Sequence, residues 1–128
     1  MRAWRDRVDH IHISRLPGGD LTWAEPELLW LGHSATCAFL RSGNLLIVYG
    51  YSFEEGFGVR ARRMPSEATD LSEEELITRD DGSVSDLAYP HDVSLPDGRV
   101  FVTYYVNRQI DAHDKTAPRY IEACIVCE

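Results

Sequence analysis

Two stretches of this 128-residue chain are apolar at successive positions, and they restrict the fold more than any other feature. Leu45–Tyr51 and Val100–Tyr105 are rich in β-branched and aromatic residues, which favour extended strands. Neither stretch alternates between apolar and polar residues, as a strand with one wet face does. We therefore expect both strands to be covered on both faces by other layers of the protein.

The two stretches belong to an internal repeat. Phe39–Tyr49 aligns with Ser94–Tyr104, an offset of 55 residues (39 to 94). Each copy runs from a strand through a glycine-containing turn, Arg41–Asn44 or Pro96–Arg99, into the apolar strand. Glycine suits such a turn because it accepts a positive φ angle. About four strands in a period of roughly 40–50 residues are typical of a blade of a β-propeller.

The remaining stretches fit an all-β chain, because no segment has the period of an amphipathic helix. His and Ile alternate in Asp9–Arg15, which predicts a strand with both histidines on one face. The chain is expected to divide into an outer strand pair at 9–31, a full blade at 35–79 and three strands of a further blade at 86–126. The predicted fold is a partial β-propeller of about two four-stranded antiparallel blades.

Two blades are too few for a closed propeller, which has about four to eight. Their outermost faces would expose large apolar areas to water. Two explanations stay open: the chain is a fragment of a longer one, or copies of it assemble into a ring. Three two-bladed copies would close a six-bladed ring without open sheet edges, so a homo-oligomer, and a trimer in particular, is expected if the chain is not a fragment.

Charge and cysteine content narrow the partners and the compartment. The net charge of −8 disfavours nucleic acid, and no apolar run approaches the ~20 residues of a membrane span. The N-terminus lacks the apolar segment of a signal peptide, and three cysteines are an odd number, which together favour the cytoplasm. Cys124 and Cys127 are three residues apart on a predicted strand and would face opposite ways, which disfavours a metal-chelating or redox pair. We therefore expect two buried structural thiols. His10 and His12 lack a third ligand nearby, and we expect no metal and no cofactor.

Several segments resemble the sialidase-type (BNR/Asp-box) six-bladed propeller superfamily. Asp86–Tyr105 resembles its late-blade hairpin, Gly58–Arg62 the strand that runs into an Asp-box, and Arg119–Ala123 its closing strand. Leu16–Trp23 resembles a degenerate Asp-box in which only Thr22–Trp23 match in register. The resemblance covers most of this chain but only the C-terminal third of a family member.

The resemblance implies an exo-acting glycoside hydrolase in which a tyrosine nucleophile is activated by a glutamate. Tyr89 falls at the position of that tyrosine, and Arg60 or Arg62 could supply one of the three arginines that bind the carboxylate of sialic acid. The glutamate, the acid/base aspartate and the other arginines would lie in blades that this chain lacks. A single copy is therefore not expected to be catalytically complete.

A milder interpretation follows from the residues of the hairpin themselves. Tyr89, His91, Asp92 and Asp86 would lie on or next to an innermost strand, at the mouth of a propeller, where ligands usually bind. An aromatic ring beside carboxylates suits a sugar. Three hypotheses remain: an incomplete sialidase-like propeller, a non-enzymatic sugar-binding propeller that closes by homo-oligomerisation, and a glycosidase whose site forms between subunits. The alternative for Tyr89 is a packed aromatic, and for His91 and Asp92 a structural hydrogen-bonded pair.

Overall fold

The computed structural model describes residues 9–53, 56–67, 75–77, 80–107 and 118–128. Within these ranges the chain forms nine strands and no helix, which confirms the all-β class. The same residues therefore include no helix long and apolar enough to cross a membrane. The N-terminal residues 1–8 and residues 78–79 of the predicted edge strand lie outside the described residues.

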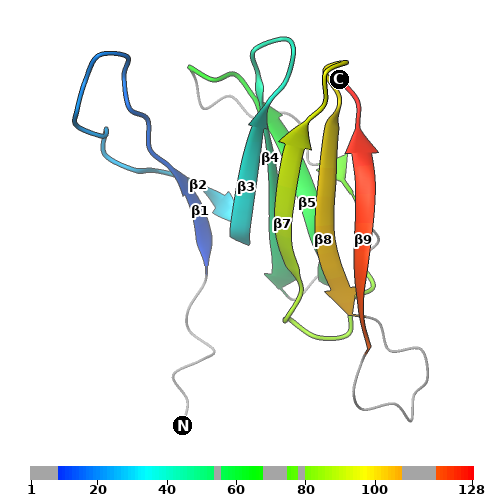
Figure 1. Cartoon of the computed structure of the whole chain (residues 1–128). Helices are drawn as coiled ribbons and strands as arrows, with labels where there is room; N and C mark the ends of the chain where they lie inside the picture. Colours follow the sequence, from blue (N-terminus) through cyan, green and yellow to red (C-terminus); the bar gives the residue numbers. More distant parts are fainter. Residues whose placement is uncertain (1–8, 54–55, 68–74, 78–79, 108–117) are drawn as a thin grey trace, which may run out of the picture.

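The nine strands form three antiparallel sheets in which sequence neighbours pair (Figure 1). The first sheet has two strands, β1 (His10–Ile13) and β2 (Glu27–Leu31). The middle sheet has four, β3 (His33–Phe39), β4 (Leu45–Phe53), β5 (Gly56–Met64) and the short β6 (Glu75–Leu76). The last sheet has three, β7 (Ala88–Ser94), β8 (Val100–Asn107) and β9 (Arg119–Val126).

The middle sheet is packed on both faces. Leu46 and Val48 of β4 belong to one apolar core together with β8 residues of the last sheet. Ile47 and Tyr49, which alternate with them along the strand, belong to a second core that includes Trp30 of β2. Side chains alternate between the faces of a strand, so both faces of β4 are covered. The prediction of double burial is confirmed for Leu45–Tyr51.

Within this chain the same prediction is not met for Val100–Tyr105. Val100, Val102 and Tyr104 are buried against the middle sheet, whereas the intervening Phe101 is 36% exposed. The described residues place no further layer on that side of β8, so its apolar residues meet solvent. A continuous apolar run thus indicates a strand but does not create its second neighbour.

The turns of the repeat have matching geometry. In the first copy Leu40 N–H donates to the carbonyl of Asn44 (2.8 Å), and Gly43 has φ 87°. In the second copy Leu95 N–H donates to the carbonyl of Arg99 (2.8 Å), and Gly98 has φ 89°. The two hairpins therefore have the same local design and differ in what covers them.

The N-terminal sheet shows the predicted alternation. Ile11 is buried, while His10 and His12 are exposed. The Asp-box-like segment carries an exposed Trp23, on an exposed stretch of chain. The cysteines are all free. Cys124 is half-buried and Cys127, which follows the end of β9, is exposed, so the expectation of two buried thiols is wrong.

Candidate functional site

The loop that leads into β7 is fixed by one buried side chain. Asn107, at the end of β8, is completely buried, and its Oδ1 accepts hydrogen bonds from the backbone N–H groups of Ser83 (2.8 Å) and Val84 (2.9 Å). Its Nδ2 donates to the carbonyl oxygens of Val84 (3.2 Å) and Asp86 (2.5 Å). A buried amide with this many partners holds a loop firmly. The position of Asp86 is therefore set by the strand behind it.

Asp86 is the centre of a small polar cluster at this end of the sheet. The hydroxyl of Tyr105 donates to Asp86 Oδ1, and an amino group of Arg119 donates to Asp86 Oδ2 at 2.5 Å. The hydrogen bond from Tyr105, followed by the one from Arg119, holds the pKa of the Asp86 carboxyl below its usual range. Burial, followed by the bond to Asp86, raises the pKa of Tyr105 to about 12. At neutral pH the cluster thus holds a carboxylate, a phenol and a guanidinium.

Tyr89 joins this cluster through its ring. The ring lies parallel to that of Tyr105, with centroids 5.6 Å apart and an interplanar angle of 6°, and Tyr89 is 56% exposed. Ala88 and Tyr89 both have positive φ angles, 81° and 43°, at an irregularity in the pairing of β7 with β8. Left-handed non-glycine residues are uncommon and concentrate at functional sites. We call Asp86, Tyr89, Tyr105 and Arg119 the Asp86 cluster.

A second polar chain adjoins the same loop. His33 Nε2 lies 2.9 Å from Ser52 Oγ, and this hydroxyl donates to the carbonyl oxygen of Ser85 (3.2 Å). Because the hydroxyl proton is used on Ser85, Nε2 is the donor towards Ser52. Burial lowers the pKa of the His33 imidazole, and the negative charge of Asp9 partly opposes this. The imidazole is therefore neutral at neutral pH and supports the residue that precedes Asp86.

His91 and Asp92 point to opposite faces of β7. Asp92 accepts a hydrogen bond from Thr36 Oγ1 of β3 (2.8 Å), so it ties together two strands that lie side by side. His91 pairs in register with Thr103 and is exposed on the outer face of the last sheet. The expected grouping of Tyr89, His91, Asp92 and Asp86 therefore divides at Asp92, which faces β3. Asp86 and Tyr89 both contact Tyr105, and His91 lies on the same outer face as Tyr105.

Arg60 and Arg62 also lie apart from Tyr89. The guanidinium of Arg60 is paired with Asp80, and its Cζ lies 3.5 Å from the centroid of the Tyr51 ring. The Cζ of Arg62 lies 5.0 Å from the centroid of the Trp30 ring. Both side chains are thus engaged around the middle sheet, on residues of β2, β4 and the loop before β7.

The sequence reasoning missed Tyr105, Arg119, Asn107 and His33. A signal for Tyr105 was present: counting outwards from the pair Ser94–Val100 in an unbroken register places Tyr89 opposite Tyr105. The structure shifts this register by one residue, so Ala88 pairs with Tyr105, and the ring of Tyr89 stacks on that of Tyr105. The sequence offered no signal for Arg119, because nothing in it indicates which strand end Arg119 lies beside. Only the pairing of β9 with β8, in which Arg119 faces Asn107, brings it to this end of the sheet.

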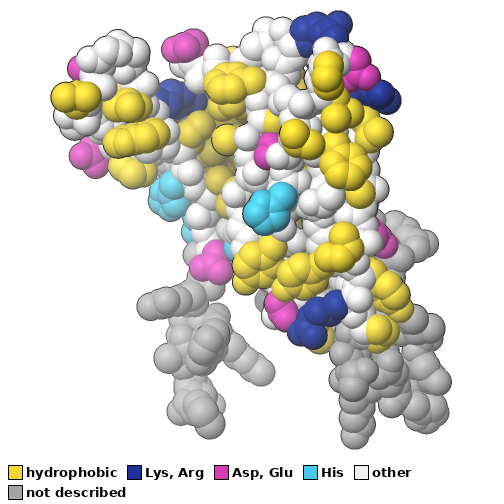
Figure 2. All heavy atoms as spheres, viewed as in Figure 1, with side chains coloured by type: hydrophobic (Ala, Val, Ile, Leu, Met, Phe, Trp, Pro, Cys, Tyr) yellow, Lys and Arg dark blue, Asp and Glu magenta, His cyan; other side chains and the backbone are white. Residues whose placement is uncertain are grey.

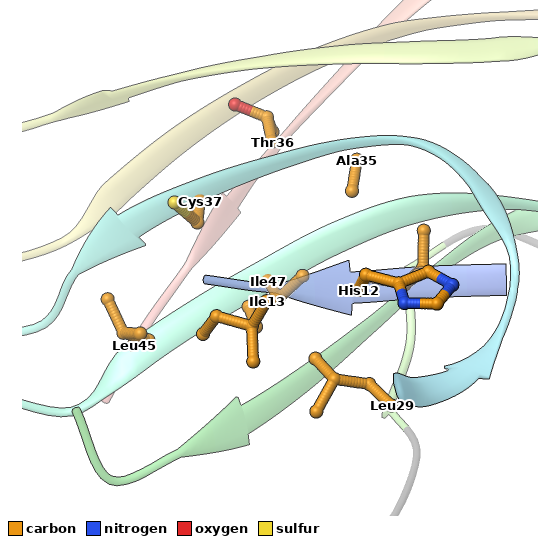
Figure 3. A pocket seen from close by; sticks show the side chains of 9 residues that line it. His12, Ile13, Leu29, Ala35, Thr36, Cys37, Leu45 and Ile47 are labelled. Carbon is orange, nitrogen blue, oxygen red and sulfur yellow. The ribbon is translucent and has the colours of Figure 1, made fainter. Parts of the chain in front are cut away.

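An apolar pocket lies elsewhere, between the first sheet and the middle one (Figure 3). Its volume is about 200 Å³, and residues such as Ile13, Leu29 and Ile47 line it. Thr36 points away from these residues in Figure 3, in keeping with its bond to Asp92. Desolvation, followed by the charge of Asp92, raises the pKa of the Cys37 thiol beside the pocket, which makes it a poor nucleophile at neutral pH. The pocket thus lacks the polar equipment of the Asp86 cluster.

The outer face of the β7–β9 sheet carries exposed apolar side chains. Figure 2 looks onto this face and shows two groups of hydrophobic side chains with a histidine between them. By register and exposure the face includes Val93, Phe101, Ile121 (80% exposed) and Ile125. These side chains form two exposed apolar groups, separated by the row that His91 and Thr103 occupy. The row formed by Tyr105 and Ile121 lies next to the end of the sheet, so the Asp86 cluster is at the rim of this face.

The described residues gather no set of three potential metal-ligating side chains. No protein-family model matches the sequence, and no curated protein matches it. A crystal structure of a protein of unknown function from Dyadobacter fermentans DSM 18053 is similar to this chain, with a TM-score of 0.74 and 32% sequence identity. The match covers 91% of this chain and 31% of that one, so this chain spans about a third of the length of the solved structure.

Proposed function

We propose that this chain is a segment of a sialidase-like β-propeller that binds carbohydrate and does not complete a hydrolytic site by itself. One observation carries the proposal: an exposed tyrosine ring, Tyr89, stacked on Tyr105 beside the ionised Asp86 and its partner Arg119. A sugar offers an apolar ring face and a rim of hydroxyls. An aromatic surface next to charged hydrogen-bonding groups is complementary to both.

The chemistry of the cluster favours binding over catalysis. A tyrosine nucleophile needs a base that removes its proton. Here the carboxylate of Asp86 is bonded to Tyr105, and the pKa of Tyr105 is raised to about 12, so its phenolate is disfavoured at neutral pH. Arg60, one candidate for binding a sialic acid carboxylate, is paired with Asp80. A glycosidase would need groups from another subunit or from further chain.

The exposed face of the β7–β9 sheet supports an assembly of blades. The middle sheet is covered on both faces by its neighbours, and the β7–β9 sheet offers a similarly apolar second face. About three segments of this size equal the length of the similar solved structure, since the match covers 31% of that chain. We propose that three copies close a ring in which each β7–β9 sheet is covered by the next copy. The rim position of the Asp86 cluster would then place a subunit boundary beside the sugar.

Saturation-transfer NMR against a panel of neutral and acidic methyl glycosides tests the binding function. We expect binding that Tyr89→Phe retains and Tyr89→Ala abolishes, since the ring and not its hydroxyl makes the contact. Absence of binding to every glycoside would refute the proposal. Release of a chromogenic aglycone that Tyr89→Phe abolishes would instead favour a glycosidase, with Tyr89 as its nucleophile.

Light scattering tests the ring. A solution mass of three chains supports it, and a monomer leaves the chain as a fragment whose outer face is covered by other parts of a longer protein. If Tyr89→Ala changed the mass and left glycoside binding intact, the ring of Tyr89 would belong to the subunit contact and not to the sugar.

A further inference from the structure

We infer that the Asp86 cluster selects a neutral, hydroxyl-rich sugar and rejects sugars that carry a carboxylate. This rests on the proposed function, since it names the class of ligand for the same site. It departs from what the sialidase resemblance implies, which is recognition of sialic acid through its carboxylate.

Arg119 and Arg60 are already paired with carboxylates, which disfavours an acidic ligand. Recognition of a sugar carboxylate needs guanidinium groups that converge on it without carboxylates of their own. Arg119 donates to Asp86, and Arg60 donates to Asp80 while it lies over a ring of the middle sheet. The positive charge of the cluster is therefore already matched by a carboxylate within 2.5 Å.

The negative charge of the Asp86 carboxylate also disfavours an acidic ligand. The bonds from Tyr105 and Arg119 hold its pKa below the usual range, so it stays ionised wherever the protein is folded near neutral pH. A ligand carboxylate placed here would meet this negative charge, in a chain whose net charge is already −8. A hydroxyl would instead be attracted, because a carboxylate offers about four acceptor positions and these two donors use two of them.

The tyrosine pair completes the fit to a neutral pyranose. One face of the Tyr89 ring is covered by Tyr105, and the residue is still 56% exposed. Stacking on the open face would bury the C–H side of a sugar ring and leave its hydroxyls free to reach the carboxylate of Asp86, which is bonded to Tyr105. Neither contact requires a charge on the ligand.

Matched pairs of ligands test the inference on the intact chain. Methyl glucoside and methyl glucuronide differ only at C6, and methyl galactoside and methyl galacturonide form a second pair. We expect each neutral sugar to bind at least about tenfold more tightly than its uronide, measured by ¹H–¹⁵N NMR titration. In Asp86→Asn the ratio should fall towards one, because the repulsion is removed.

Asp97→Asn is the matched control. Asp97 is also exposed and also pairs with an arginine, Arg99 (2.7 Å), but at the turn of the β7–β8 hairpin. Asp97→Asn should leave the affinities for the neutral sugar and for its uronide unchanged. Tighter binding of a uronide or of methyl α-sialoside would overturn the inference and leave the binding function standing. Failure of every sugar to bind would overturn both.

Discussion

The β3–β4 hairpin and the β7–β8 hairpin are two copies of one design in different surroundings. Leu46 and Phe101 occupy equivalent positions of the repeat, one residue into the second strand. Leu46 is completely buried between layers, and Phe101 is 36% exposed on an outer face. The comparison teaches that turn and strand are local properties, whereas burial of the second face depends on a neighbouring layer.

The largest effect should come from truncating this equivalent pair. Leu46→Ala removes a side chain from a closed core and should lower the free energy of unfolding by about 2–5 kcal/mol. Phe101→Ala should cost less, about 1–2 kcal/mol, because the side chain is only partly covered in this structure. Urea unfolding of both variants measures the difference.

Equal losses for the two variants would break the comparison. They would mean that the outer face of the β7–β9 sheet is covered in solution, and the loss in Phe101→Ala should then depend on protein concentration, as expected for a subunit contact.

Asn107→Ala tests whether the buried amide of Asn107 holds the loop that leads into β7. The change leaves the N–H group of Val84 without its acceptor, whereas the N–H group of Ser83 keeps its bond to the backbone carbonyl of residue 107 (3.2 Å). We expect urea unfolding to show a loss of about 1–3 kcal/mol, the cost of one polar group left unpaired, together with loss of glycoside binding because Asp86 is no longer held. Unchanged binding would show that the loop keeps its shape without Asn107.

The two arginine–aspartate pairs sharpen the comparison further. Arg60→Met disrupts a partly buried pair of the middle sheet and should cost about 1–3 kcal/mol without changing glycoside affinity. Arg119→Met disrupts an exposed pair of the last sheet and should cost at most about 1 kcal/mol while weakening glycoside binding. The opposite assignment, with binding sensitive to Arg60 alone, would place the site around the middle sheet.

The smallest effect concerns alkaline pH. The pKa of Tyr105 is raised to about 12 by burial and by Asp86, whereas an unfolded tyrosine ionises near pH ~10. The native state keeps a proton that the unfolded state loses, so this contribution to stability is present below pH ~10 and disappears as the pH rises through about 12. Phenolate absorbance should show a late-titrating tyrosine that Tyr105→Phe removes.

Asp86→Asn should lower the pKa of Tyr105, because the carboxylate that holds its proton is gone. If the late-titrating group persisted unchanged in this variant, burial alone would account for it and the bond to Asp86 would contribute little.

The all-β class and most strands were predictable, and the site only in part. The apolar runs, the two glycine turns and the His-Ile alternation located strands that the structure contains. Asp86 and Tyr89 were predicted to lie near each other, and both contact Tyr105. His91 and Asp92 were predicted to share the site, but adjacent strand residues point to opposite faces, and Asp92 is bonded to Thr36 of β3. Arg60 and Arg62 were assigned to the site by resemblance alone, and their contacts with Asp80 and Trp30 depend on side-chain packing that the sequence does not show.

The sequence by itself determined what is local: strands from β-branched and aromatic runs, tight turns from glycines with positive φ, and the matched design of the two hairpins. Only the tertiary structure decided which apolar faces are covered, since burial needs a second layer from distant parts of the chain. It also decided that Asn107 and Arg119, more than 20 residues from Asp86, serve that carboxylate and its loop. Hydrogen bonds act over a few ångströms, and only the pairing of β7, β8 and β9 brings these groups within that distance.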